Sequence, residues 1–329
     1  KTELDENAQF ALDQYLMRGG AVIALAGAFD IDAGEGIKAE SGDQKLLDLL
    51  DAYGVGVRQS FVMDPQNTPL PVPVNVKRGQ YTIRSYRNLP YPFFADIRRE
   101  GFADRHAALN GVDSVTMTWA SPLELKAIDG VESEVLLKTS AGSWLQGSPV
   151  LEPDFQQYPE AGFAPADADS TSEKVVAATL RGAIPSYFAD KPSPLFIPDA
   201  KPEGDLEDKA DRTGRTMKQS TPDARLVVLA SADVVGDAVA SLSMQPSGGA
   251  YRGNLLLVRN LIDWTLEDTD LLQIRSAGAF ARTLRKMDDA ERWKWQLGNY
   301  GFVLAALLGV LGVAITRRRM ARPIPLEDA

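Results

Sequence analysis

Apolar residues follow two patterns along the chain, one typical of amphipathic helices and one typical of buried strands. Helical spacing of apolar residues appears in three stretches, at residues 4–18, 46–53 and 252–266. Strand-length runs rich in β-forming residues lie between and around them, at residues 21–26, 55–63, 114–119, 133–138, 175–180, 225–230 and 271–275. Because such runs are typical of strands buried on both faces, the alternation predicts an α/β fold in which helices cover a mostly parallel sheet.

Two stretches do not fit this alternation. Residues 64–110 carry repeated prolines and short β-like pieces, and much of 145–222 is rich in Pro, Asp, Gly and Ser. We interpret them as long surface insertions in one domain that spans residues 1–275. An acidic cluster at 205–211 offers oxygen ligands for a cation, but a solvated acidic loop is the more common outcome for such a sequence.

Residues 297–316 form an uncharged apolar stretch that predicts a transmembrane helix. A helix of about 20 residues rises about 30 Å, which matches the hydrocarbon core of a bilayer. The expected anchors at its two ends are Trp293, Trp295 and Tyr300 on the entry side and Arg317, Arg318 and Arg319 on the exit side. The alternative is a buried core helix.

The basic residues after this stretch predict the orientation of the protein. Positive charge favours the cytoplasmic side of a membrane. Residues 317–329 are therefore expected to be a cytoplasmic basic tail, and residues 276–296 a connector next to the membrane. The domain before them is expected outside the cytoplasm, on the periplasmic side of the inner (plasma) membrane.

Composition narrows the classes of function. The formal net charge is −10, which disfavours nucleic acid as a partner and broad contact with anionic lipid. The chain has no cysteine, which excludes disulfides, thiolate metal sites and cysteine nucleophiles. It begins with Lys1 rather than Met, and we expect it to be part of a longer protein.

The sequence offers little catalytic chemistry. His106 is the only histidine, no G-x-S-x-G elbow or phosphate-binding loop is present, and we expect no catalytic residue, metal or cofactor. Ligands of open parallel sheets bind beyond the carboxyl ends of the strands. The candidate ligand-binding residues at such ends are Gly27, Asp30, Thr139, Ser140, Ser231 and Asp233. The alternative is that these six are turn and helix-cap residues.

Several segments together resemble the GldG-like family, the gliding-motility-associated auxiliary subunits of ABC transporters. The segments that carry the resemblance are LDQYLMRGGAVIAL at 12–25, LLDAYGVGVRQSFVMD at 49–64, EVLLKTSAGSW at 134–144, VVAATLRGAIPSYF at 175–188, RLVVLASADVVGD at 225–237 and NLLLVRNLIDWTLEDTDLLQIR at 254–275. The resemblance implies a three-layer α/β sandwich similar to flavodoxin-like and class I glutamine-amidotransferase-like folds. It also implies an ABC permease and an ATPase subunit as partners.

Three functions remain open from the sequence. The favoured one is a non-enzymatic auxiliary or substrate-recognition component of an ABC-type transport system, anchored in the membrane. The second is a free-standing membrane-anchored module that binds a saccharide or cell-wall polymer, or serves as a scaffold. The third is a degenerate or unrecognised hydrolase, for which Ser140 is the residue to test by substitution.

Overall fold

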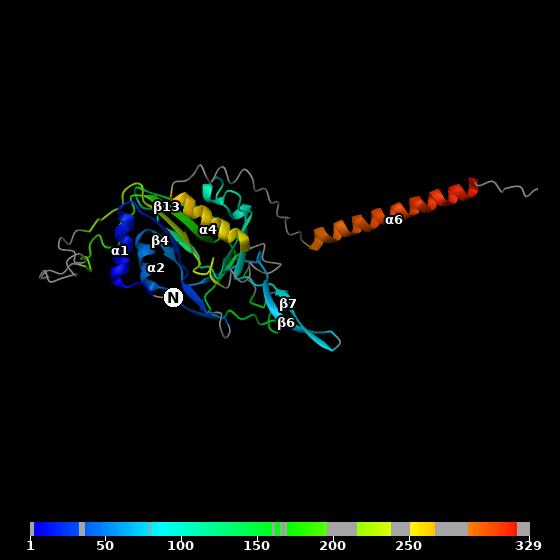
Figure 1. Ribbon diagram of the computed structural model, residues 1–329, viewed down its shortest axis with the longest axis horizontal. Helices are drawn as coiled ribbons and strands as arrows, with labels where there is room; N and C mark the ends of the chain where they lie inside the picture. Colours follow the sequence, from blue (N-terminus) through cyan, green and yellow to red (C-terminus); the bar gives the residue numbers. More distant parts are fainter. Residues whose placement is uncertain are drawn as a thin grey trace, which may run out of the picture. The chain divides into compact units, whose positions relative to one another are not determined.

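The computed structural model covers residues 1–329 and describes residues 3–32, 37–78, 80–159, 162–164, 167, 170–195, 216–237, 251–266 and 289–320. The chain divides into two compact units, Lys1–Ala281 and Arg282–Ala329 (Figure 1). The predicted strand at 271–275, the acidic cluster at 205–211, most of the connector and residues 321–329 of the tail lie outside the described residues.

All three predicted helices are present in the first unit. They are α1 (Glu6–Met17), α2 (Gln44–Ala52) and α4 (Arg252–Thr265). Asp5 caps α1 by accepting the Ala8 N–H at 2.6 Å, and Asp43 caps α2 by accepting two N–H groups of its first turn. Two 3₁₀ turns, η1 (Arg99–Gly101) and η2 (Ala107–Leu109), lie in the long stretch between strands.

The central sheet contains four strands, in the order β1 (Ala21–Leu25), β14 (Arg225–Leu229), β13 (Val175–Gly182) and β11 (Val131–Lys138). β1 pairs with β14 in parallel, whereas β13 pairs antiparallel with both of its neighbours. The prediction of a mostly parallel sheet is therefore wrong for the described strands, which form a mixed sheet. An apolar run reports that a strand is buried on both faces, and it carries no information about the direction of its neighbours.

The remaining strands form five antiparallel pairs. They are β2 (Phe29–Asp32) with β3 (Lys38–Ser41), β4 (Val55–Val57) with β10 (Leu123–Leu125), β5 (Phe61–Met63) with β12 (Trp144–Gln146), β6 (Leu70–Arg78) with β7 (Tyr81–Leu89), and β8 (Phe94–Arg98) with β9 (Ser114–Thr118). The single strand predicted at 55–63 is thus two short strands, β4 and β5, that pair with different partners.

Part of the stretch that we interpret as a surface insertion lies in the core. Tyr91, Phe93 and Phe94 are fully buried, and β8 pairs with the predicted strand β9. Tyr91 and Phe94 are packed edge to face, with ring centroids 4.8 Å apart. These aromatic rings form a second hydrophobic cluster beside the aliphatic core of the central sheet, and burial of large rings contributes strongly to stability. The interpretation as surface is therefore wrong for this part of 64–110.

Helix α4 is fixed to β9 by a buried amide. Asn254 accepts the Thr116 N–H at 2.8 Å and donates to the Thr116 carbonyl at 2.7 Å, so it replaces a strand partner at that edge. The preceding residue, Gly253, packs so closely that a Cβ atom there would lie 1.8 Å from the Ser114 carbonyl oxygen. Glycine is therefore required at this position, and the helix packs directly on the backbone of the strand.

The second unit contains helix α6 (Asp289–Met320). Within it, Arg292–Arg319 is long and apolar enough to cross a membrane, and its most apolar 18 residues have a mean hydropathy of 1.9, with none of them buried. Trp293, Trp295 and Tyr300 are exposed near its start, and Arg317, Arg318 and Arg319 lie in its last turn. By length and composition this helix could anchor the protein in a membrane.

Candidate functional site

A hollow of about 670 Å³ lies at the carboxyl ends of β1 and β14. The sequence predicts a ligand site there, because ligands of open α/β sheets bind beyond the carboxyl ends of the strands. Gly27 and Ala232, which follow these two strands, line it. The acidic residues of its lining are Glu3, Asp30, Asp32, Glu40 and Asp43. Its lining includes no lysine, arginine or histidine among the residues that the structure describes. The hollow is therefore electronegative, and it favours cationic or hydroxyl-bearing groups over anions.

Three of these carboxylates come from the short ribbon β2–β3. Asp30 and Asp32 lie on β2, and Glu40 lies directly opposite Asp30 on β3. The fourth, Asp43, also has a structural role, because its Oδ2 accepts the Leu4 N–H at 2.7 Å while its Oδ1 caps α2. Of these acidic residues, only Asp30 is among the candidates predicted from the sequence. Asp32 and Glu40 join Asp30 through the pairing of β2 with β3, which the pattern of the sequence does not predict.

Gly27 follows β1 and lies close to the segment that follows β14. A Cβ atom at this position would lie 3.2 Å from the Phe29 carbonyl oxygen and 3.7 Å from the Ser231 Cα. The turn therefore has little room for a larger residue. This close packing places the backbone of Gly27 at the surface of the hollow, and a ligand there would meet main chain rather than a side chain.

Ser231 and Asp233 follow β14 next to the hollow, but their groups are engaged with the protein. The buried Ser231 hydroxyl donates to the Thr118 carbonyl at 2.5 Å, and its oxygen accepts the Asp233 N–H at 3.2 Å. This arrangement fixes the turn after β14 against β9. Of the six candidate residues, the structure brings Gly27 and Asp30 into the lining of the hollow, with Ser231 and Asp233 beside it.

Thr139 and Ser140 are in a different place, next to the buried carboxylate of Asp64. Thr139 accepts the Lys174 N–H at 2.8 Å. Ser140 donates both its N–H and its hydroxyl to Asp64, at 2.9 and 2.7 Å. Asp64 also accepts the Ser143 hydroxyl at 2.9 Å and the Gln66 N–H at 2.8 Å. Each oxygen of this carboxylate therefore accepts two hydrogen bonds, a geometry that satisfies it fully without a cation.

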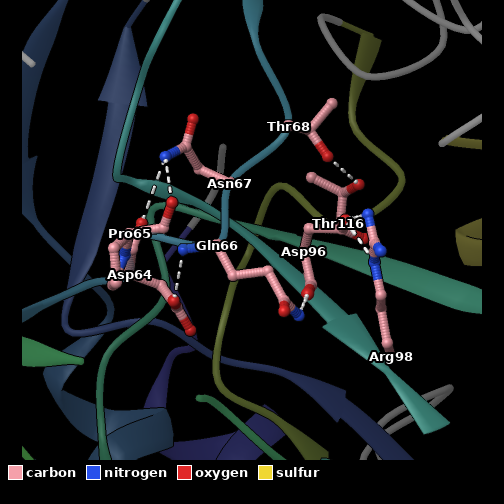
Figure 2. Close-up of polar contacts among 8 residues, drawn as sticks. All are labelled: Asp64, Pro65, Gln66, Asn67, Thr68, Asp96, Arg98 and Thr116. Atoms are coloured by element: carbon pink, nitrogen blue, oxygen red, sulfur yellow. Dashed lines mark hydrogen bonds and ion pairs between the residues drawn. The ribbon is translucent and has the colours of Figure 1, made fainter. Parts of the chain in front are cut away.

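The segment after Asp64 continues this polar network toward β8 (Figure 2). Gln66 donates to the Asp96 carbonyl at 2.6 Å, and Asn67 donates to the Pro65 carbonyl at 3.0 Å. The Asp96 carboxylate in turn pairs with Arg98 at 2.8 Å. These bonds hold the loop between β5 and β6 in one conformation. Asp64 and its hydrogen-bond partners therefore join this loop to the loop between β11 and β12. In the hydrolase alternative Ser140 would be the nucleophile. In the structure its hydroxyl instead donates to the carboxylate of Asp64.

His106 is buried against α4. Its Nδ1 accepts the Ala108 N–H at 3.2 Å, which makes it the cap of η2, and its ring lies 4.9 Å from that of Trp264. Burial lowers the pKa of His106 from 6.5 to about 4. His106 also lines a second surface hollow, and the charged residues of that hollow are Arg99, Asp104 and Arg105. Within the described ranges, no group of three or more His, Asp or Glu side chains could hold a metal ion.

The substitution His106→Asn is expected to make stability less sensitive to acid. Asparagine supplies the same kind of cap but does not titrate. The unfolded chain binds more protons than the folded chain between pH 6.5 and about 4, so the parent protein loses stability as the pH falls through this range. The loss approaches about 3 kcal/mol near pH 4. Urea unfolding at pH 7 and pH 4.5 measures it, and an equal loss in the two proteins would contradict the assignment.

Together, fold and site define a mixed α/β domain with an electronegative hollow at its strand ends, followed on the same chain by an apolar helix of membrane-spanning length. The family model described as "ABC-type uncharacterized transport system" matches residues 1–261, and the chain belongs to this family of ABC transporter auxiliary components. The family implies association with an ABC transport system and indicates no catalytic role. No curated protein and no solved structure matches the chain.

Proposed function

We propose that this auxiliary component recognises a substrate for its ABC transport system without any catalysis of its own. The observation that carries the proposal is the hollow at the ends of β1 and β14, which lies inside the part of the chain that defines the family. Its volume of about 670 Å³ falls in the range of small-molecule sites, roughly 300–1,000 Å³. Gly27 and Asp30 are the proposed contacts, with Ser231 and Asp233 as neighbours that hold the turn.

The charge of the hollow narrows the class of substrate. Carboxylates accept hydrogen bonds from ammonium groups and from sugar hydroxyls, and they repel phosphates and other anions. We therefore propose a cationic or polyhydroxylated substrate. We propose Thr139 and Ser140 as ligand-binding residues only of a separate site, because neither lines the hollow. Ser140 donates to Asp64, and Thr139 accepts the Lys174 N–H.

Helix α6 supports a membrane-anchored arrangement. We propose that it spans the membrane once, with the α/β domain on the extracytoplasmic side and the basic tail in the cytoplasm. Arg317, Arg318 and Arg319 in its last turn support this orientation through the preference of positive charge for the cytoplasmic side. One helix has no interior through which a polar solute could pass, so the transport path must belong to other subunits, a permease driven by an ATPase.

The order of its sequence segments supports a place near the GldG-like subunits within the family.

The second candidate function is a free-standing saccharide-binding module, which the carboxylate-lined hollow also favours. Carboxylates bind sugar hydroxyls whether or not a transporter is present. The presence or absence of transporter subunits therefore separates the two functions.

Co-purification tests the proposal directly. Intact cells are first treated with an amine reagent that cannot cross the membrane, and the full chain is then extracted in mild detergent. We expect it to be recovered with a permease and an ATPase subunit, and to carry label on lysines of the α/β domain. A matched chain that ends before Leu297 should lose most of this association.

Recovery of the full chain alone, under conditions that preserve other ABC complexes from the same membrane, would favour the free-standing module. Label confined to lysines made accessible by breaking the cells would overturn the orientation.

A further inference from the structure

The ribbon β6–β7 extends beyond the rest of the first unit (Figure 1). Its two strands pair antiparallel along their whole length, from Leu70 opposite Leu89 to Arg78 opposite Tyr81. No third strand pairs with either edge among the described residues. Exposed strand edges readily accept another strand, and natural proteins usually block them.

One edge of this ribbon is partly blocked by proline, and the other is open. Pro71 and Pro73 lie on β6 and have no N–H, so they must occupy positions that do not donate to β7. In an antiparallel pair the residues opposite such positions also turn their N–H and C=O groups outward. Asn88 is opposite Pro71 and Tyr86 is opposite Pro73, so every second residue of β7 from Thr82 to Asn88 presents its backbone outward. Proline thus removes two of the four outward N–H groups of β6, at Pro71 and Pro73, whereas all four outward positions of β7 keep theirs.

The composition of the ribbon differs from that of the protein as a whole. Residues 70–89 contain four basic residues and no acidic one, within a chain of net charge −10. The described residues before α6 include eleven exposed large apolar side chains, and four of them lie on this ribbon. They are Val76, Tyr81, Ile83 and Tyr86, which are between 45% and 77% exposed. Exposed aromatic and aliphatic side chains beside positive charge are typical of a binding surface.

We infer that β7 is a docking edge to which a partner subunit of the transport system adds an extended, acidic segment as a third strand. This inference rests on the proposed function, because it takes the partner from the same assembly. The backbone groups of β7 supply main-chain hydrogen bonds, and the basic side chains select acidic residues on the incoming strand. A second copy of this chain is disfavoured, because two ribbons with four basic residues each would repel one another.

Hydrogen exchange of the full chain in detergent tests whether a strand is added. In the chain alone, the outward N–H groups from Thr82 to Asn88 should exchange quickly. In the complex with the transporter subunits they should be protected, while the rest of the first unit changes little. A complex without protection at these amides would overturn the inference and leave the proposed function intact.

A synthetic peptide of alternating Val and Glu, about eight residues long to match a strand, probes the edge without the transporter. It should bind the full chain, lose affinity as salt is raised, and protect the same amides. A peptide of alternating Val and Lys should not bind. The peptide experiment tests the β7 edge even where no transporter subunit is recovered. A failure of the docking edge can therefore be distinguished from a failure of the proposed function.

Two substitutions at Thr82 supply the matched pair of variants. Thr82→Pro removes one outward N–H without removing a bond to β6, and Thr82→Val changes the side chain but keeps the N–H. We expect the proline variant to bind the acidic peptide about tenfold more weakly and the valine variant to bind as the parent does. Equal binding by all three proteins, or protection of the amides by anionic lipid vesicles but not by the peptide, would overturn the inference.

Discussion

The substitution Val228→Asp is expected to unfold the α/β domain. Val228 is fully buried on β14, where it lies between Ala24 of β1 and Ala178 of β13. A carboxylate at this position would lie in the hydrophobic core, with a neighbouring strand on each side. An uncompensated buried charge costs about 4 kcal/mol or more, against a total stability of roughly 5–15 kcal/mol for a typical domain.

The matched control for this prediction is Val150→Asp, which makes the same chemical change at a side chain that is 58% exposed. We expect its free energy of unfolding to lie within about 0.5 kcal/mol of the parent value. Thermal and urea unfolding, followed by tryptophan fluorescence, measures both variants. Normal melting of Val228→Asp would mean that β14 does not lie in the middle of the sheet.

The strands of the central sheet were the most predictable part of the fold. The runs at 175–180 and 225–230 are apolar because β13 and β14 are largely buried, and burial is the property that apolar residues report. The run at 21–26 also forms a strand, but four of the five residues of β1 are only partly buried. Their pairing was not predictable in the same way. The antiparallel direction of β13 depends on where the chain returns after β11, and no residue within β13 encodes that path.

The second hydrophobic cluster shows a different limit. Tyr91, Phe93 and Phe94 lie in a proline-rich stretch without helical or strand periodicity, which favours the interpretation as a loop. Their burial arises from contacts with distant aromatic residues such as Phe61 and Phe163. Proline interrupts regular secondary structure, but it does not prevent a segment from packing, so aromatic residues were the better signal here.

The candidate site was predictable in its location and only partly in its residues. The rule for open α/β sheets placed it at the end of β1, and Gly27 and Asp30 line the hollow found there. Asp32, Glu40 and Asp43 join the hollow through the β2–β3 pairing and the start of α2. Thr139 and Ser140 also follow a strand, but that strand, β11, lies at the other side of the sheet from β1. The loop after it contacts Asp64 rather than the hollow.

Asp13 is a residue whose importance was invisible in the sequence. It lies in the amphipathic helix α1, where an acidic residue is expected to face water, but it is fully buried. Its Oδ1 accepts the Tyr53 hydroxyl at 3.0 Å and the Tyr187 N–H at 2.9 Å. Its Oδ2 accepts the Ser186 hydroxyl at 2.7 Å and the Gln14 amide at 2.9 Å. One carboxylate therefore joins α1, the residue after α2 and the segment after β13.

The substitution Asp13→Ala is expected to lower the free energy of unfolding by about 4 kcal/mol, because it leaves several buried donors without an acceptor. Burial, the charge of Asp13 and the hydrogen bond to it all raise the pKa of Tyr53, so its hydroxyl stays a donor. The control Asp51→Ala removes a carboxylate that is 57% exposed and paired with Lys126 at the surface. We expect that control to cost less than about 1 kcal/mol.

A double substitution separates the lost acceptor from simple loss of packing. Tyr53→Phe alone removes one donor from an intact Asp13 and should cost about 1 kcal/mol. In the Asp13→Ala background, the same change removes a donor that no longer has a partner, so it should be neutral or stabilising. The coupling between the two positions, measured by urea unfolding of all four proteins, should therefore be at least about 1 kcal/mol. Additive effects would show that Asp13 does not organise this junction through its hydrogen bonds.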